Sequence, residues 1–261
     1  MIKFFRRFRK DLIQKNKISQ YLKYAIGEII LVVIGILIAL QFNTWRVEKN
    51  DRHIEKILLK NIKMDLESDI QELKGVRAFK TSQNKAALRL LEYLIDTSKP
   101  LEDTVQFVND FNLMIYFTVP SPNRTSFDIA TSTGYLNNIT NDRLNKELSN
   151  YYANIGLEQH VTETKRFINA FNDTYLINKY RIFNNLVMAL DGQGGDYALE
   201  RYKDDNRPVI QLQDIRGDVS LENYLNNLSI RLEIGIIGLE REESWALRLV
   251  GDIEEELNLK N

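Results

Sequence analysis

The sequence predicts an all-α protein in which an N-terminal transmembrane helix is followed by an extracytoplasmic bundle of long antiparallel helices. Three observations support this prediction. The run from Ile29 to Leu40 has no polar side chain, leucine and isoleucine recur three and four residues apart through much of the remainder, and the 261 residues include only four prolines. Because 44% of the residues are hydrophobic, the chain can bury a core. We divide it into a basic segment (1–20), a transmembrane helix (21–45) and a helical domain (46–261).

The basic segment, residues 1–20, mixes arginines with phenylalanines. Phe4 and Phe8 lie four residues apart, as in a helix that lies on anionic lipid. We therefore expect contact with the lipid surface from six side chains: Phe4, Phe5, Phe8, Arg6, Arg7 and Arg9. The alternative is a basic flank that only sets membrane topology, which explains the charge but not the spacing of the phenylalanines. Both interpretations keep this segment at the membrane.

The transmembrane helix is expected from Tyr24 to Trp45, about 22 residues, which is enough to cross a bilayer core of about 30 Å. Eight basic residues and one acid precede Tyr24, so the positive-inside rule puts the N-terminus in the cytoplasm. Ala39 is followed by Leu40 and not by a small-residue cleavage site. The sequence thus predicts an uncleaved signal anchor that crosses the membrane once, with the C-terminal domain on the outer side.

One face of this helix is a candidate contact surface, because four residues share it by helical spacing: Glu28, Val32, Gly35 and Ala39. Gly35 and Ala39 form a small-residue pair that lets another helix approach closely. Glu28 near the cytoplasmic boundary could be protonatable or bind a partner, since acids within membranes seldom face lipid. Alternatively, its carboxylate reaches water or bonds to Lys23 or Tyr24.

The stretch from Tyr24 to Trp45, YAIGEIILVVIGILIALQFNTW, resembles the N-terminal signature of a large family of single-pass proteins from Bacteroidota, known only as a domain of unknown function. A second stretch, from Thr125 to Tyr152, is similar to that family's internal motif, with an aromatic residue, a glycine and a terminal tyrosine pair. Where members of the family have Asn-Asn-Trp after the span, this chain has Asn43-Thr44-Trp45. The resemblance covers most of the chain and implies a location in a bacterial inner membrane, crossed once, with a periplasmic C-terminal domain. It implies no activity and no catalytic residues.

Helices are expected next over much of residues 46–117. From Ile54 to Leu73 the apolar residues keep a four-residue step, which predicts that the membrane helix continues outward. Gly75 is expected to loosen this helix before a second helical pattern at 87–94. After a turn at Ser98–Pro100, a third helix is expected over 101–117.

Residues 119–186 are expected to begin with an irregular loop, because Pro120 and Pro122 favour extended geometry in the residues before them. Thr125 or Ser126 can then cap a short helix that ends at Gly134. A long helix is expected from 141 to 186, with a kink at Gly156.

The C-terminal part is expected to contain a loop at 191–208 and a last helix from about Ser220 to Leu257, which makes four or so long helices in all. Within the loop, Asp191 to Asp196 contains three glycines between two acids. Its spacing does not match a calcium loop or a phosphate loop, so a flexible turn is favoured over an ion site.

The amino-acid composition gives little support for a catalytic or metal-binding site. No cysteine is present, and the two histidines, His53 and His160, lack a second histidine at ligand spacing. Clustered aromatics such as Phe167, Phe171 and Tyr175 could line a ligand cleft, but their helical spacing favours core packing. We therefore predict no catalytic residue, cofactor or metal. Since 27 basic and 34 acidic residues follow the span, we also expect no nucleic-acid partner.

The leading functional hypothesis is a non-enzymatic interaction or scaffold protein, which self-associates or joins an envelope complex. The alternative is a periplasmic sensory or ligand-binding module that signals through a partner membrane protein, since few residues lie on the cytoplasmic side. An enzyme ranks third, because distant acids can converge only in the fold.

Overall fold

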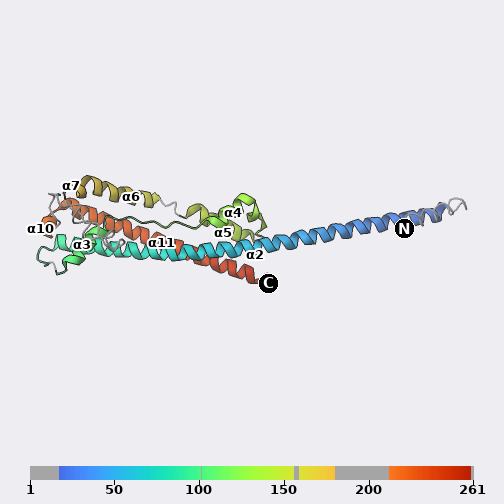
Figure 1. Cartoon of the computed structure of the whole chain (residues 1–261), viewed down its shortest axis with the longest axis horizontal. Coiled ribbons are helices and arrows are strands. Elements are labelled where there is room, and N and C mark those ends of the chain that lie inside the picture. Colours follow the sequence, from blue (N-terminus) through green and yellow to red (C-terminus); the bar gives the residue numbers. More distant parts are fainter. Residues whose placement is uncertain (1–17, 101, 156–158, 180–211, 260–261) are drawn as a thin grey trace, which may run out of the picture. The chain divides into compact units, whose positions relative to one another are not determined.

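The computed structural model describes residues 18–100, 102–155, 159–179 and 212–259, and these residues form helices and connecting segments with no strand (Figure 1). The all-α prediction is therefore confirmed for the part described. The chain divides into two compact units, residues 1–57 and 58–261. The six side chains expected to touch lipid, Phe4 to Arg9, lie outside the described residues.

Helix α2 (Ile18–Ile95) is a single helix of 78 residues. The expected loosening at Gly75 and the separate helix at 87–94 were wrong, because α2 runs through both. Leu73 and Val76 on either side of Gly75 are buried, so the apolar stripe continues across it. One glycine within a helix costs about 1 kcal/mol relative to alanine, which is less than the burial of one large aliphatic side chain contributes.

Three short helices follow α2. Helix α3 (Thr104–Leu113) is shorter than the helix expected over 101–117, and an irregular connection leads to α4 (Thr125–Thr133) and the 3₁₀ turn η1 (Tyr135–Asn138). The loop around Pro120 and Pro122 is confirmed. So is the helix end at Gly134, which has a φ of +78°, a conformation that glycine adopts without strain.

The helix expected from 141 to 186 is divided into shorter elements. The helix start expected at 141 is confirmed, and Asn141 caps α5 (Asp142–Asn154) by accepting the Leu144 N–H. Helix α5 ends at an extended Ile155. Residues 156–158, with the expected kink at Gly156, lie outside the described part. Three further elements follow: α6 (Gln159–Phe171), the π-helical turn η2 (Asn172–Leu176) and α7 (Ile177–Lys179).

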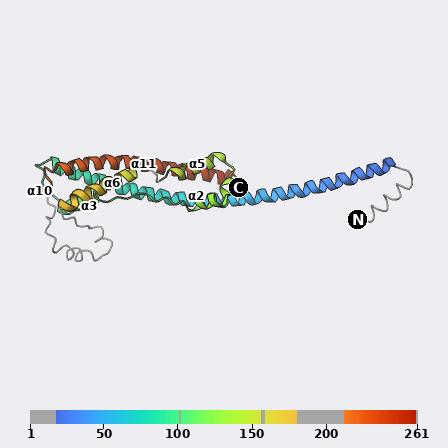
Figure 2. The same cartoon turned by 90° about the horizontal axis from the view of Figure 1, so that it is seen from above.

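The last described elements are α10 (Leu212–Ile215) and α11 (Val219–Leu259), a helix of 41 residues. Within residues 58–261, α11 lies antiparallel to α2, because pairs between them run in opposite directions along the chain (Figure 2). Lys63 pairs with Glu254 at 2.6 Å, Arg77 with Glu240 at 3.1 Å, and Ser229 donates to Asn84 at 2.6 Å. Of the helices that the structure describes, only α2 and α11 are long.

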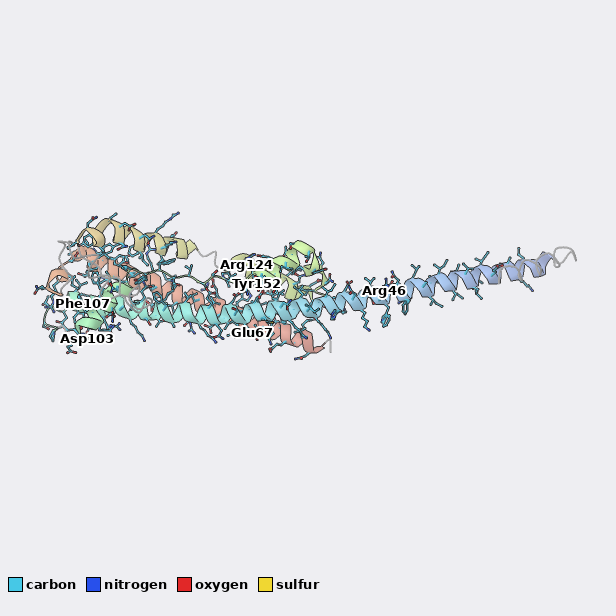
Figure 3. The ribbon with its side chains drawn as sticks, viewed as in Figure 1. Arg46, Glu67, Asp103, Phe107, Arg124 and Tyr152 are labelled. Atoms are coloured by element: carbon cyan, nitrogen blue, oxygen red, sulfur yellow. The ribbon has the colours of Figure 1, made fainter. Side chains whose placement is uncertain are left out.

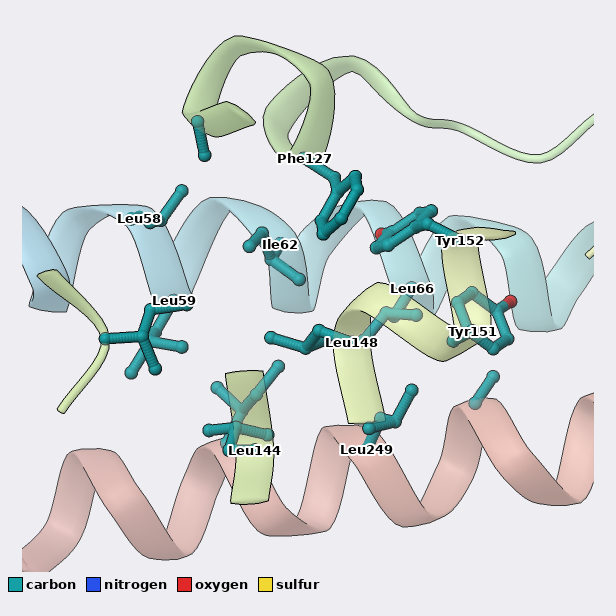
Figure 4. Close-up of a cluster of buried hydrophobic side chains, with 14 of the residues drawn as sticks. Leu58, Leu59, Ile62, Leu66, Phe127, Leu144, Leu148, Tyr151, Tyr152 and Leu249 are labelled. Atoms are coloured by element: carbon teal, nitrogen blue, oxygen red, sulfur yellow. The ribbon is translucent and has the colours of Figure 1, made fainter. Parts of the chain in front are cut away.

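Three buried clusters lie along this helix pair, and the smallest consists of Leu73, Val76 and Leu239. The first, drawn in Figure 4, joins Leu66 of α2 and Leu148 of α5 to Leu249 of α11, with Phe127 stacked 4.5 Å above Tyr152. The second joins Leu90 of α2 to side chains of α3, α6 and the N-terminal half of α11. Buried aliphatic and aromatic side chains therefore hold the short helices to the long pair.

Candidate functional site

The predicted membrane-contact face lies on the apolar part of α2. This is the one helix among the described residues that is long and apolar enough to cross a membrane, and its most apolar stretch is 0% buried. Val32, Gly35 and Ala39 are all exposed, and Glu28 is partly buried. A side chain added at Gly35 would meet no atom within 4 Å, so this face has room for a neighbouring helix.

A row of three carboxylates on α2 forms the most organised polar feature of the helical domain. Asp65, Asp69 and Glu72, here called the carboxylate row, lie four and three residues apart and thus on one face of α2. Their partners are N–H groups of residues 121–126. Glu72 accepts the Ser121 backbone N–H at 2.7 Å, and Asp65 accepts the Ser126 backbone N–H at 2.8 Å.

Asp69 is the buried member of the row, with only 2% of its surface exposed. It accepts the Asn123 backbone N–H at 2.7 Å and the Tyr151 hydroxyl at 3.4 Å. Burial raises the pKa of Asp69 to about 6, although both hydrogen bonds act in the opposite direction. Burial also raises the pKa of Tyr151 and of Tyr152, so both phenols keep their protons.

Arg124 connects this region to α5. Figure 3 shows Arg124 close to Tyr152, where the guanidinium donates to the Tyr152 backbone carbonyl and lies 5.8 Å from the centre of its ring. A second, weaker contact at 3.4 Å joins Arg124 to Asp128 of α4. The expected cap by Thr125 or Ser126 was wrong, because Asp65 of α2 accepts the Ser126 N–H instead. The carboxylate row thus caps α4 from another helix.

The aromatic residues singled out in the sequence pack against one another. The Phe171 ring stacks on Tyr224 at 3.8 Å, and Phe167 stacks on the same ring at 5.1 Å. Next to them, Tyr175 donates to Asp218, and Lys179 contacts both groups, while Asp218 also caps the first turn of α11. These contacts fit the core-packing interpretation rather than an open cleft.

A second apolar surface lies on α11. Ile230, Ile234 and Ile237, here called the isoleucine face, are 58%, 45% and 53% exposed and lie four and three residues apart on one side of the helix. A hollow of about 230 Å³ adjoins Ile230 and Ile234, with Thr164 of α6 and Arg231 also in its lining. Another, of about 360 Å³, adjoins Arg241 and Trp245 beside the end of α5.

Sequence reasoning missed both the carboxylate row and the isoleucine face. A signal existed for each, because the acids of the row and the three isoleucines all have helical spacing next to a buried stripe. These signals are ambiguous, since a row of acids is usually a solvated helix face and only the fold places residues 121–126 against it.

The side chain of His160 lies outside the described part of the structure. Among the residues that the structure describes, no group of three or more histidine, cysteine or acidic side chains is placed to hold a metal ion. His53 is exposed on α2. The glycine-rich loop at 191–196 lies outside the described part, and so do Tyr180 and Phe183.

Comparison with known protein families finds one match. Residues 28–193 fit the model described as "Family of unknown function (DUF6090)". No curated protein and no solved structure matches the chain. The matched range begins at Glu28 of the apolar helix and includes the carboxylate row, residues 121–126 and the tyrosine pair of α5.

Proposed function

The chain belongs to DUF6090, a family of unknown function, and from this premise we propose that it is a membrane-anchored helical interaction protein. The apolar part of α2 would anchor it once in a bacterial inner membrane, with the N-terminus in the cytoplasm and the helical domain in the periplasm. The basic residues before the span support this orientation. The helical domain would join a second copy or another envelope protein and would catalyse no reaction.

The isoleucine face is the observation that carries this proposal. Three large aliphatic side chains, each about half exposed, follow one another along α11 at the spacing with which one helix packs on another. Burying each would contribute on the order of 1.5–3 kcal/mol. A contiguous apolar strip of this kind on a folded domain marks an interaction surface more often than a chance exposure.

Arginines beside the isoleucine face indicate the chemistry of the partner. Arg231 lies 4.8 Å from the centre of the Phe167 ring, and Arg241 lines the hollow next to Trp245. Neither guanidinium forms an ion pair with a described residue. A partner helix that presents aliphatic side chains flanked by carboxylates would therefore satisfy both the apolar strip and the arginines.

Photo-crosslinking in the native membrane tests this surface. We expect benzoylphenylalanine in place of Ile234 in the full chain to give one discrete crosslinked product, whereas the same substitution at Met64, which is 67% exposed on α2, gives none. The combined R231E and R241E changes should remove the product, and K60E on α2 should leave it. Equal crosslinking from the Ile234 and Met64 positions, or no product from Ile234, would refute the proposal.

A ligand-binding sensory module is the second candidate, and the hollow of about 360 Å³ beside Trp245 favours it. Native mass spectrometry of the full-length protein, gently extracted, separates the two functions. A homo-oligomer or a stoichiometric protein complex supports the interaction protein. A monomer that retains a small molecule supports the sensory module, and in the W45F variant, which leaves Trp245 as the single tryptophan, that molecule should change the tryptophan fluorescence.

A further inference from the structure

Residues 121–126 are attached to α2 almost entirely through carboxylates. Within residues 120–123, Pro120 and Pro122 have no N–H, so the backbone donors are those of Ser121 and Asn123. Each of these donors is accepted by a different member of the carboxylate row, at 2.7 Å in both cases. Asp65 accepts two further bonds, from the Asn123 side chain at 3.0 Å and from the Ser126 backbone N–H at 2.8 Å.

The three carboxylates lie close together on one face of α2. Asp65, Asp69 and Glu72 span about 10 Å of helix, at about 1.5 Å per residue. None of them forms an ion pair with a described residue. Asp69 in the middle is buried, so its negative charge is opposed by the loss of water and by a like charge on each side.

We propose that residues 121–126 form a pH-sensitive switch, held to α2 more tightly when Asp69 is protonated than when it is ionised. Protonation removes the buried charge and its repulsion from Asp65 and Glu72. A neutral carboxyl group still has an oxygen that accepts the Asn123 N–H, so the bond persists in weaker form while the larger electrostatic cost disappears.

The groups that face Asp69 come from every element packed around it. Asp65 and Glu72 of α2 act on Asp69 directly, whereas Arg124 of the segment and Asp128 of α4 act on Tyr152. Tyr151 and Tyr152 belong to α5, and Glu242 of α11 acts on Tyr151. Both tyrosines stay neutral at physiological pH, since burial raises their pKa values. Tyr151 therefore remains a donor to Asp69 throughout.

The direction of the pH effect follows from the linkage between protonation of Asp69 and release of residues 121–126 from α2. The pKa of Asp69 is about 6 when the segment is attached, and its usual value of 3.8 applies when release exposes the carboxylate to water. Attachment is therefore strongest at low pH and weakens as the pH rises through 6. Between pH 7.5 and pH 5, the equilibrium constant for attachment should rise about tenfold.

Hydrogen exchange of the full chain in lipid nanodiscs tests the switch. After correction for intrinsic exchange rates, we expect the amides of Ser121 and Asn123 to be protected about tenfold more at pH 5 than at pH 7.5. The D69N variant should show the same protection at both pH values. The E72Q variant, which changes an exposed member of the row, should keep the pH dependence.

Two results would overturn the proposal. One is equal protection of these amides in the wild-type protein at both pH values, and the other is a pH dependence that survives in D69N. If D69N does not fold, the pKa of the Asp69 carboxyl group, measured by carbon NMR in the wild-type protein, tests the switch instead. A pKa close to the usual value for aspartate would refute the switch.

Discussion

At the scale of single residues, the neighbours Tyr151 and Tyr152 show how position alters the role of the same side chain. Both rings are fully buried in the first cluster. The Tyr151 hydroxyl donates to Asp69, whereas the Tyr152 hydroxyl has no partner among the described residues. A buried hydroxyl without a hydrogen bond costs about 1–3 kcal/mol, so Tyr152 contributes packing through its ring and loses stability through its oxygen.

We expect Y152F to leave the melting temperature unchanged or to raise it, because the substitution removes only the unsatisfied oxygen. Y151F should lower it, since this change removes a donor to the buried Asp69 carboxylate. Circular dichroism of the full-length variants in one detergent measures both. A fall in melting temperature for Y152F as large as that for Y151F would show that the Tyr152 hydroxyl is hydrogen-bonded in solution.

At the scale of elements, the long helices supply side chains that satisfy the short ones. Gln83 of α2 donates to the backbone carbonyls of Leu113 and Tyr116, at 2.7 and 2.6 Å, just after α3 ends. Arg89 of α2 makes two parallel bonds to the buried Asp110 of α3. Short helices have little stability alone, so such contacts and the buried clusters determine where they form.

The continuity of α2 leads to a prediction at Gly75. A methyl group there would meet no atom within 4 Å, and helix propensity favours alanine. We expect G75A to stabilise the protein by about 0.5–1 kcal/mol, measured as a rise in melting temperature. G134A is the matched control and should lower it, because Gly134 has a φ of +78°. A lower melting temperature for G75A would mean that α2 bends there in solution.

At the scale of the whole molecule, the chain combines an apolar helix with a helical domain that has exposed surface of its own. The apolar stretch of α2 and the isoleucine face of α11 are both candidate contact surfaces. They differ in physical basis. Association within a membrane depends on close packing at small residues, whereas association in water depends on burying aliphatic side chains.

Assembly through the membrane face is tested at Gly35 and Ala39. Changing both to leucine should reduce the size of the oligomer seen by native mass spectrometry, because the larger side chains keep a second helix away. The matched control changes Val33 to leucine and Leu37 to isoleucine, which alters another side of the same helix. An unchanged oligomer in the G35L and A39L variant would contradict a role for this face.

Local patterns in the sequence were enough to predict several features of the fold. The apolar run from Ile29 to Leu40, the helix start at Asn141 and the helix end at Gly134 depend on residues within a few positions of one another. The loosening expected at Gly75 was wrong, because the burial of Leu73 and Val76 outweighs the low helix propensity of one glycine. The apolar periodicity of residues 141–186 also did not show that this stretch is divided into shorter helices.

The sequence by itself determined that the chain is helical and that one helix is apolar enough to cross a membrane, because both follow from local composition and spacing. Only the tertiary structure decided that Asp65 caps α4, that Asp69 is buried, and that Ile234 is exposed while Leu232 is not. These outcomes depend on contacts between residues 50 or more positions apart, and no local pattern specifies which helix will cover which face.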